Sequence, residues 1–200
     1  MADVSPTGLT AIEEVEGGGR TLVFSSRLVL ASNTTLQLSL LFAYLYLRAN
    51  NFGSMWHPSG VGTPPQALAL IALAFPVLTL LALVAVSNAV SKSRESSSLN
   101  GLLWLAFLLA VLTGAVRILL MYQFNWTLNS AGTYADVSTL WYAVLLAEFI
   151  GVAAWLLSLV MGHVRGTDRL SPAHARAILD QWTYITVVSI AVYLLIQYVN

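Results

Sequence analysis

The sequence contains no cysteine among its 200 residues and few charged residues. Without cysteine there is no disulfide, no thiolate ligand for zinc or an iron–sulfur cluster, and no cysteine nucleophile. Charged residues make up 9% of the chain and hydrophobic residues 58%, whereas a soluble domain has about 25% and about 45–50%. This composition excludes an ordinary soluble enzyme, a disordered chain and a basic nucleic-acid-binding protein. We therefore expect an integral membrane protein.

Five long apolar segments occupy most of the chain. Each is close to the ~20 residues that an α-helix needs to cross a bilayer. They lie at about residues 28–48, 67–90, 102–122, 138–161 and 182–199. No internal repeat relates them. The sequence predicts an all-α, polytopic bundle of five transmembrane helices over residues 28–200. Residues 1–27 are predicted to be a mostly irregular cytoplasmic tail, in which residues 7–16 can form a short surface helix.

The basic residues divide unevenly between the two predicted sides of the membrane. One side receives seven of the nine, which are Arg20, Arg27, Lys92, Arg94, Arg165, Arg169 and Arg176. The other side receives only Arg48 and Arg117. Because loops rich in Lys and Arg stay in the cytoplasm, this division predicts a cytoplasmic N-terminus and an external C-terminus.

The histidines give little support for a metal centre in the membrane. His57 is predicted on the outer side, and His163 and His174 on the inner side, all in loops or at a helix end. A membrane haem is usually held by histidines that face each other from helices. We therefore expect this chain to bind no haem, copper or other metal itself.

Glu148 is the only acidic residue deep in a predicted helix, and Arg117 lies in the preceding one. An ionisable side chain inside a membrane is costly and is by default a candidate for function. One interpretation is a structural pair between Glu148 and Arg117, or a contact of either with a lipid headgroup. Proton transfer at Glu148 is the alternative. Arg48 and Trp56 are further candidates for structural or lipid contacts.

The first apolar segment carries an unusual number of small and polar residues. They are Ser32, Asn33, Thr34, Thr35, Gln37 and Ser39. Such residues allow transmembrane helices to approach and to form hydrogen bonds with one another. A polar pathway or a headgroup site is the alternative interpretation. No nucleophile elbow, phosphate-binding loop or metal-ligand cluster accompanies them, so no catalytic residue is assigned.

Four stretches resemble subunit III of the haem-copper oxidases (cytochrome c and quinol oxidases), in its short five-helix form. They are F-A-Y-L-Y-L-R at 42–48, M-W-H-P at 55–58, G-T-Y at 132–134 followed by Ser138, and Q-W-T-Y-I-T-V-V at 181–188. The order and spacing of these stretches agree with the family over residues 28–200. The family patterns are F-A-F/Y-x-Y/F-x-R, W-P-P, G-x-Y-x-S and W-H-F-V-D-x-V-W.

Several positions depart from the family. Thr34 falls where the family usually has a helix glutamate, and His57 replaces the first proline of W-P-P. Thr183 and Thr186 replace the terminal histidine and aspartate, and the H-x-x-H of the penultimate helix is absent near Glu148. Roles that depend on those residues are therefore not transferred to this chain.

The resemblance implies a non-catalytic accessory subunit in a bacterial inner membrane. Such a subunit packs beside the catalytic subunit I, which holds the haem and copper, and beside other subunits. It binds phospholipid and supports stability and proton uptake in aerobic electron transport. A subunit of another membrane redox complex and a small membrane transporter are the alternatives. A lipid-modifying membrane enzyme would need a catalytic constellation that the sequence lacks.

Overall fold

The structure, a computed structural model, describes residues 7–50, 56, 65–92, 96–123, 132–166 and 170–199, with the side chains of all but 7–17, 96–97 and 123. These residues form five α-helices: α1 (Thr7–Ala49), α2 (Gln66–Ser91), α3 (Ser96–Gln123), α4 (Gly132–Arg165) and α5 (Pro172–Tyr198). Every one of the five is long and apolar enough to cross a membrane. The predicted all-α, five-helix membrane architecture is confirmed, and the chain is a multi-pass membrane protein.

Some residues used in the sequence analysis lie outside the described part of the chain. They are Met55, His57, Pro58, Arg94 and Arg169.

The prediction of a mostly irregular tail over residues 1–27 is wrong, because α1 already begins at Thr7 and continues through Gly17–Gly19. Glycine weakens a helix by about 1 kcal/mol per residue relative to alanine, which is why the glycine run was expected to interrupt it. Once a helix has formed on either side, however, each further residue adds a hydrogen bond. A Cβ built on Gly19 lies 3.4 Å from the Cβ of Ala173, so the lack of a side chain also allows α1 to approach α5.

Helix α5 also starts earlier than predicted, at Pro172 instead of residue 182. Ser171 is its N-cap, and its hydroxyl accepts a hydrogen bond from the backbone N–H of His174 at 3.3 Å. Serine at the N-cap and proline at the first helical position are both strong signals for a helix start. The first turns of α5 are too polar to be recognised by hydropathy, so the capping signal decides where this helix begins.

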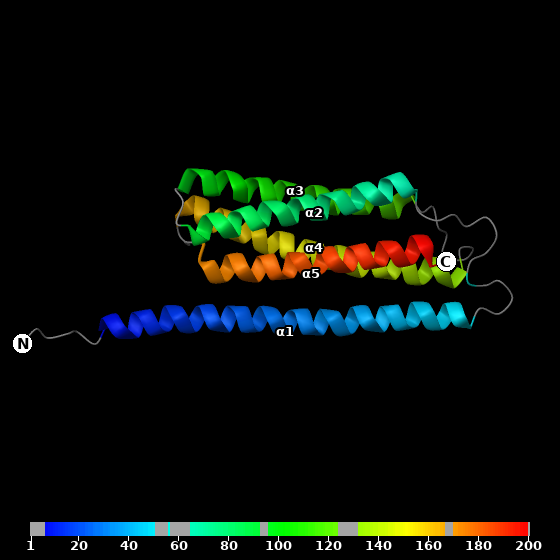
Figure 1. The fold of residues 1–200 in the computed structure, drawn as a ribbon, viewed down its shortest axis with the longest axis horizontal. Helices are drawn as coiled ribbons and strands as arrows, with labels where there is room; N and C mark the ends of the chain where they lie inside the picture. Colours follow the sequence, from blue (N-terminus) through cyan, green and yellow to red (C-terminus); the bar gives the residue numbers. More distant parts are fainter. Residues whose placement is uncertain are drawn as a thin grey trace, which may run out of the picture.

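The helices form a bundle in which α1 occupies one edge (Figure 1). Among the described helices, α1 packs only against α4 and α5, while α2 packs against α3 and α5. The start of α1, the end of α2, the start of α3, the end of α4 and the start of α5 lie at the same end of the bundle. We call this the α1-start end, and the opposite one the C-terminal end.

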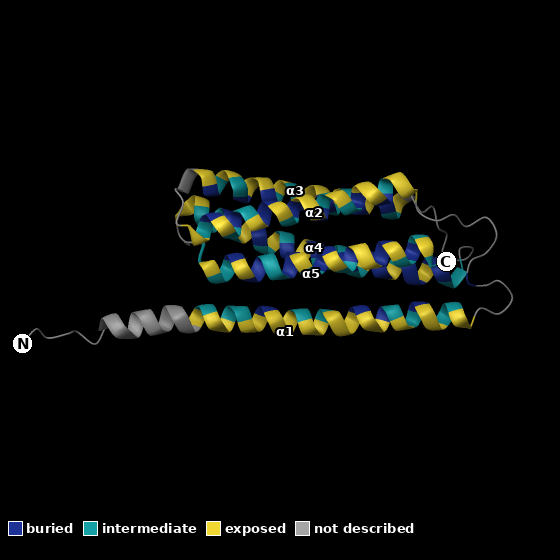
Figure 2. Cartoon of the chain, in the orientation of Figure 1, coloured by how far each residue is buried: buried dark blue, intermediate teal, exposed yellow. Residues whose placement is uncertain are grey.

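The interior of the bundle contains alanines and aromatic side chains besides large aliphatic ones, whereas its outside is covered mostly by large aliphatic side chains. Helices α2 and α3 bury a set of alanines: Ala69, Ala72, Ala82, Ala89, Ala106 and Ala110. Leucines such as Leu38, Leu81 and Leu108 are more than half exposed, and Figure 2 shows that the outer faces of all helices, and most of α1, are exposed. Small residues inside and apolar residues outside are the pattern of helices that associate in lipid.

Candidate functional site

Polar side chains meet where α1 contacts α4, around the amide of Gln37. Gln37 is only 6% exposed. Its Nε2 donates a hydrogen bond to Oε1 of Glu148 at 3.0 Å, and its Oε1 accepts one from the indole Nε1 of Trp141. Trp141 and Glu148 lie two turns apart on one face of α4. A single amide of α1 therefore joins two polar groups of α4.

The carboxyl group of Glu148 is only half satisfied by this network. Its Oε1 accepts from Gln37, but its buried Oε2 has no hydrogen-bond partner among the described residues. A buried polar atom without a partner is rare in folded proteins and calls for an explanation. Glu148 is the one feature of this network that helix packing alone does not explain.

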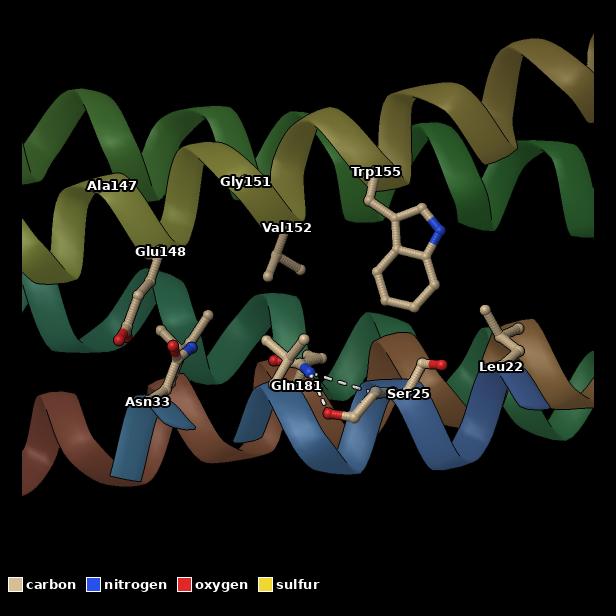
Figure 3. A pocket seen from close by; sticks show the side chains of 12 residues that line it. Leu22, Ser25, Asn33, Ala147, Glu148, Gly151, Val152, Trp155 and Gln181 are labelled. Atoms are coloured by element: carbon tan, nitrogen blue, oxygen red, sulfur yellow. Dashed lines mark hydrogen bonds between the residues drawn. The ribbon is translucent and has the colours of Figure 1, made fainter. Parts of the chain in front are cut away.

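A cavity of about 520 Å³ lies between α1, α4 and α5, beside Glu148. Figure 3 shows Glu148 of α4 and Asn33 of α1 pointing towards each other at one end of it, with Leu22 and Trp155 towards the other. Nε2 of Gln181, on α5, donates to the backbone oxygen of Ser26 at 2.9 Å and to its hydroxyl at 3.2 Å. The cavity lining is Leu22, Ser25, Ser26, Val29, Asn33, Ala147, Glu148, Gly151, Val152, Trp155, Gln181 and Ile185.

Arg117 does not pair with Glu148, which corrects the pair predicted from the sequence. Arg117 is 2% exposed, and its NH2 group donates to Oγ of Ser189 at 3.1 Å. Its guanidinium carbon lies 4.6 Å from the ring centroid of Phe149 and 5.8 Å from that of Tyr142. Its Nε and NH1 atoms have no hydrogen-bond partner within the described part of the chain.

Helix geometry explains why the pair does not form. Glu148 and Phe149 are consecutive on α4, and successive side chains of an α-helix point about 100° apart. Phe149 faces Arg117 of α3, so Glu148 is turned towards α1 and meets Gln37. The two ionisable groups lie at similar depths in the sequence, but their side chains face different neighbours.

Three hydroxyls of the polar stripe expected on the first helix form hydrogen bonds within that helix. The hydroxyls of Thr34, Thr35 and Ser39 donate to backbone oxygens four residues earlier in α1, at 2.7, 3.1 and 2.9 Å. Serine and threonine inside helices often satisfy themselves in this way. Asn33 and Gln37 are the members of the stripe that line the α1–α4–α5 cavity or bond to α4.

Aromatic residues join α1, α4 and α5 at the C-terminal end. Trp56 is buried and lies edge-on to Tyr44 and Tyr134, with ring centroids 4.9 and 5.6 Å apart. The backbone oxygen of Trp56 accepts from the N–H of Tyr134 at 3.0 Å. The hydroxyls of Tyr44 and Tyr134 donate to the backbone oxygens of Val199 and Ile196, at 3.0 and 3.2 Å. We call Tyr44, Trp56 and Tyr134 the aromatic cluster.

The remaining candidates have simpler surroundings. Arg48 lies half-buried in the last turn of α1, one turn beyond Tyr44. His174 accompanies the α5 N-cap, with its Nδ1 2.7 Å from the hydroxyl of Ser171. The described residues contain no group of three His, Asp or Glu side chains arranged to hold a metal ion.

No protein-family model matches the chain. No curated protein matches it in sequence. The fold and the site define its class, a multi-pass membrane protein with five described helices and a partly polar cavity beside a carboxyl group within a candidate membrane span.

Proposed function

We propose that the chain is a non-catalytic accessory subunit of a respiratory haem-copper terminal oxidase, of the subunit III type. The observation that carries the proposal is the aromatic cluster. Tyr44, Trp56 and Tyr134 come from three separate stretches that resemble the family, and they contact one another directly. Separate stretches that resemble one family and also meet in space are better support than each stretch alone.

The fourth stretch also contributes to the interior. Trp182 is fully buried, its Nε1 donates to the backbone oxygen of Pro76 at 2.9 Å, and its ring lies edge-on to Phe149. Thr186 stands where the family has an aspartate. Its hydroxyl donates to the backbone oxygen of Trp182 at 2.8 Å. The resemblance therefore rests on residues that hold helices together, which agrees with a structural role in a larger complex.

In this proposal the chain lies in a bacterial inner membrane with its N-terminus in the cytoplasm and its C-terminus outside. The position of the charges supports this orientation. Lys92, Arg165 and Arg176 belong to helix ends that lie at the α1-start end, and Arg48 belongs to the opposite end. Arg20 and Arg27 lie within α1 and line one groove with Arg176. Excess positive charge marks the cytoplasmic side. The catalytic subunit, which would hold the haem and copper, and membrane phospholipids are the proposed partners.

Copurification from native membranes tests the proposal. A tagged copy should bring down a stable complex with the absorption spectrum of haem, and the same chain expressed alone should show no such spectrum. A matched pair of variants links the result to the observation above: Trp56→Ala should reduce recovery of the complex, whereas Trp104→Ala, on the exposed side of α3, should not. Recovery with redox partners that lack haem and copper would favour another redox complex.

A small proton-coupled transporter is the second candidate, and one observation favours it. The 520 Å³ cavity contains the half-satisfied carboxyl group of Glu148, and ionisable residues within membranes often mark pathways for ions or protons. A chain that is recovered alone from native membranes, and that moves a solute when reconstituted in vesicles, would replace the oxidase proposal with this one.

A further inference from the structure

We propose that the α1–α4–α5 cavity is a water-filled passage that opens at the α1-start end and carries protons to Glu148, which binds one proton inside the membrane. This inference goes beyond the accessory role proposed above and holds with or without an oxidase partner. Four observations carry it: the lining of the cavity, the charges beside its outer end, the closure of its inner end, and the contacts of Glu148.

A row of polar side chains runs along the cavity, within a lining that is otherwise apolar. Ser25, Ser26 and Asn33 follow one another along α1, Gln181 faces Ser26 from α5, and Glu148 completes the row from α4. The volume of the cavity, about 520 Å³, is many times the ~30 Å³ that a water molecule occupies in the liquid. A cavity of this size holds water where polar groups offer it hydrogen bonds, whereas a wholly apolar one stays dry, so the polar row is where we place the water.

Basic residues place the outer end of the cavity at the membrane surface. A neighbouring groove of about 560 Å³ is lined by Arg20 and Arg27 of α1 and Arg176 of α5. All three arginines are exposed, and long basic side chains extend to the level of the lipid headgroups and water. Ser26 of the cavity lining directly precedes Arg27. Asn33 lies about 9 Å further along the helix than Arg27. Water that enters at the α1-start end therefore has only a short distance to travel to Asn33.

On the C-terminal side of Gln37, buried side chains border the space between α1, α4 and α5. Beyond Gln37, α1 presents Leu40 and Tyr44, which pack with Leu145 of α4 and Ile196 of α5 in one buried cluster. Tyr44, Leu145 and Ile196 are fully buried. Trp141 adds a further barrier through its hydrogen bond to Gln37. A second cavity of about 340 Å³ lies beyond Gln37, but its lining towards the C-terminal end, which includes Leu41, Val188 and Leu195, is apolar. Because an apolar cavity stays dry, we place the access of the passage at the α1-start end only.

The surroundings of Glu148 suit the binding of a proton. From α1, the neutral amide of Gln37 bonds to it and that of Asn33 lines the same cavity. The ionisable groups close enough to act on it electrostatically are Arg117 of α3 and Tyr184 of α5. Arg117 is held by Ser189 and two aromatic rings and makes no ion pair with Glu148 in the described part of the chain. A carboxylate without an ion pair in a membrane is costly, and taking one proton from water makes it a neutral carboxylic acid whose O–H donates into the cavity.

Thiol accessibility tests the passage directly, because the chain has no cysteine of its own. Ser25→Cys and Asn33→Cys place single thiols on the cavity, and Ser32→Cys places one at the same depth on the exposed face of α1. A charged, impermeant methanethiosulfonate reagent is applied to membrane vesicles of each orientation. Because hydrocarbon excludes a charged reagent, Ser25→Cys and Asn33→Cys should react about tenfold faster than Ser32→Cys, and only from the face at which α1 begins.

Two outcomes of this labelling overturn the proposal. If Asn33→Cys reacts no faster than Ser32→Cys from either face, the cavity is filled by a lipid chain or is dry. If Asn33→Cys reacts from the C-terminal end, the access is on the wrong side.

Infrared spectroscopy tests the proton on Glu148. The carbonyl stretch of a protonated carboxylic acid should be present at neutral pH, should disappear in Glu148→Gln, and should persist in Asp180→Asn, the matched control on α5. The band should shift in deuterated water, because the proton exchanges through the passage. Asn33→Leu, which removes a polar group from the cavity and keeps Glu148, should slow this shift.

A band unaffected by Glu148→Gln, or one that never exchanges, would reject the proposal. If the chain were recovered from native membranes without haem and still gave the expected labelling and infrared results, the oxidase proposal would fail and this one would stand.

Discussion

The side-chain amide of Gln37 donates to Glu148 at 3.0 Å and accepts from Trp141, which connects the first transmembrane helix to the fourth. In lipid, hydrogen bonds between helices replace much of the hydrophobic driving force that acts in water. The strength of this connection can be measured.

Replacing Gln37 with leucine should destabilise the bundle by about 1–2 kcal/mol, because it removes the partner of both Glu148 and Trp141. Unfolding in mixed micelles, followed by circular dichroism, measures the loss. Thr35→Val is the matched control on the same helix, since the Thr35 hydroxyl bonds only to its own backbone, and it should change stability by less than about 0.5 kcal/mol. A Gln37→Leu protein as stable as the original would mean that apolar packing alone holds α1.

The separate surroundings of Arg117 and Glu148 predict that their substitutions act independently. Arg117→Gln removes the bond to Ser189 and the contacts with Phe149 and Tyr142, whereas Glu148→Gln alters the contact with Gln37. In a double-mutant cycle the two losses of stability should add to within about 0.5 kcal/mol. A double variant clearly more stable than the sum of the single changes would instead reveal the ion pair predicted from the sequence.

Trp182→Phe should cost about 0.5–1.5 kcal/mol of stability, because the indole N–H no longer donates to Pro76 while the aromatic ring is retained. The comparison is Trp104→Phe, on an exposed part of α3 where the ring contacts Phe107 of the same helix. That change should have little effect. Equal losses in both variants would show that ring size, and not the hydrogen bond of Trp182, determines the cost.

The proposed orientation predicts opposite labelling of thiols at the two ends. Ser91→Cys, at the end of α2, should be shielded from an impermeant thiol reagent added outside intact cells, and Ala49→Cys, at the end of α1, should be labelled. Both positions are exposed, so access to the side chain is equal. The reverse pattern would invert the topology deduced from the basic residues.

The sequence predicted the number of helices and the depth of the ionisable residues, because both depend on runs of apolar residues. The direction in which a side chain points around its helix was harder to predict. Glu148 and Phe149 are neighbours in the sequence, yet they contact α1 and α3 respectively. Only the arrangement of all five helices shows which face of α4 meets which neighbour, so the pair with Arg117 was a reasonable but wrong prediction.

Gln37 illustrates a second limit of the sequence. It was recognised as one of several polar residues on the first helix, but nothing in the sequence distinguishes it from Thr34, Thr35 and Ser39, which bond to their own backbone. Its contacts with Trp141 and Glu148 join residues more than a hundred positions apart. The signal that was available is chemical: glutamine is too long to satisfy itself easily on its own helix.

The packing of α1 has a consequence for biosynthesis. Helix α1 is made before α2 and α3, yet among the described helices it contacts only α4 and α5, which follow them in the chain. Until α4 and α5 have been synthesised, Gln37 and Asn33 must remain in the bilayer without their final partners. The α1 contacts therefore form late, and a chain truncated before α5 leaves α1 without one of its two neighbours.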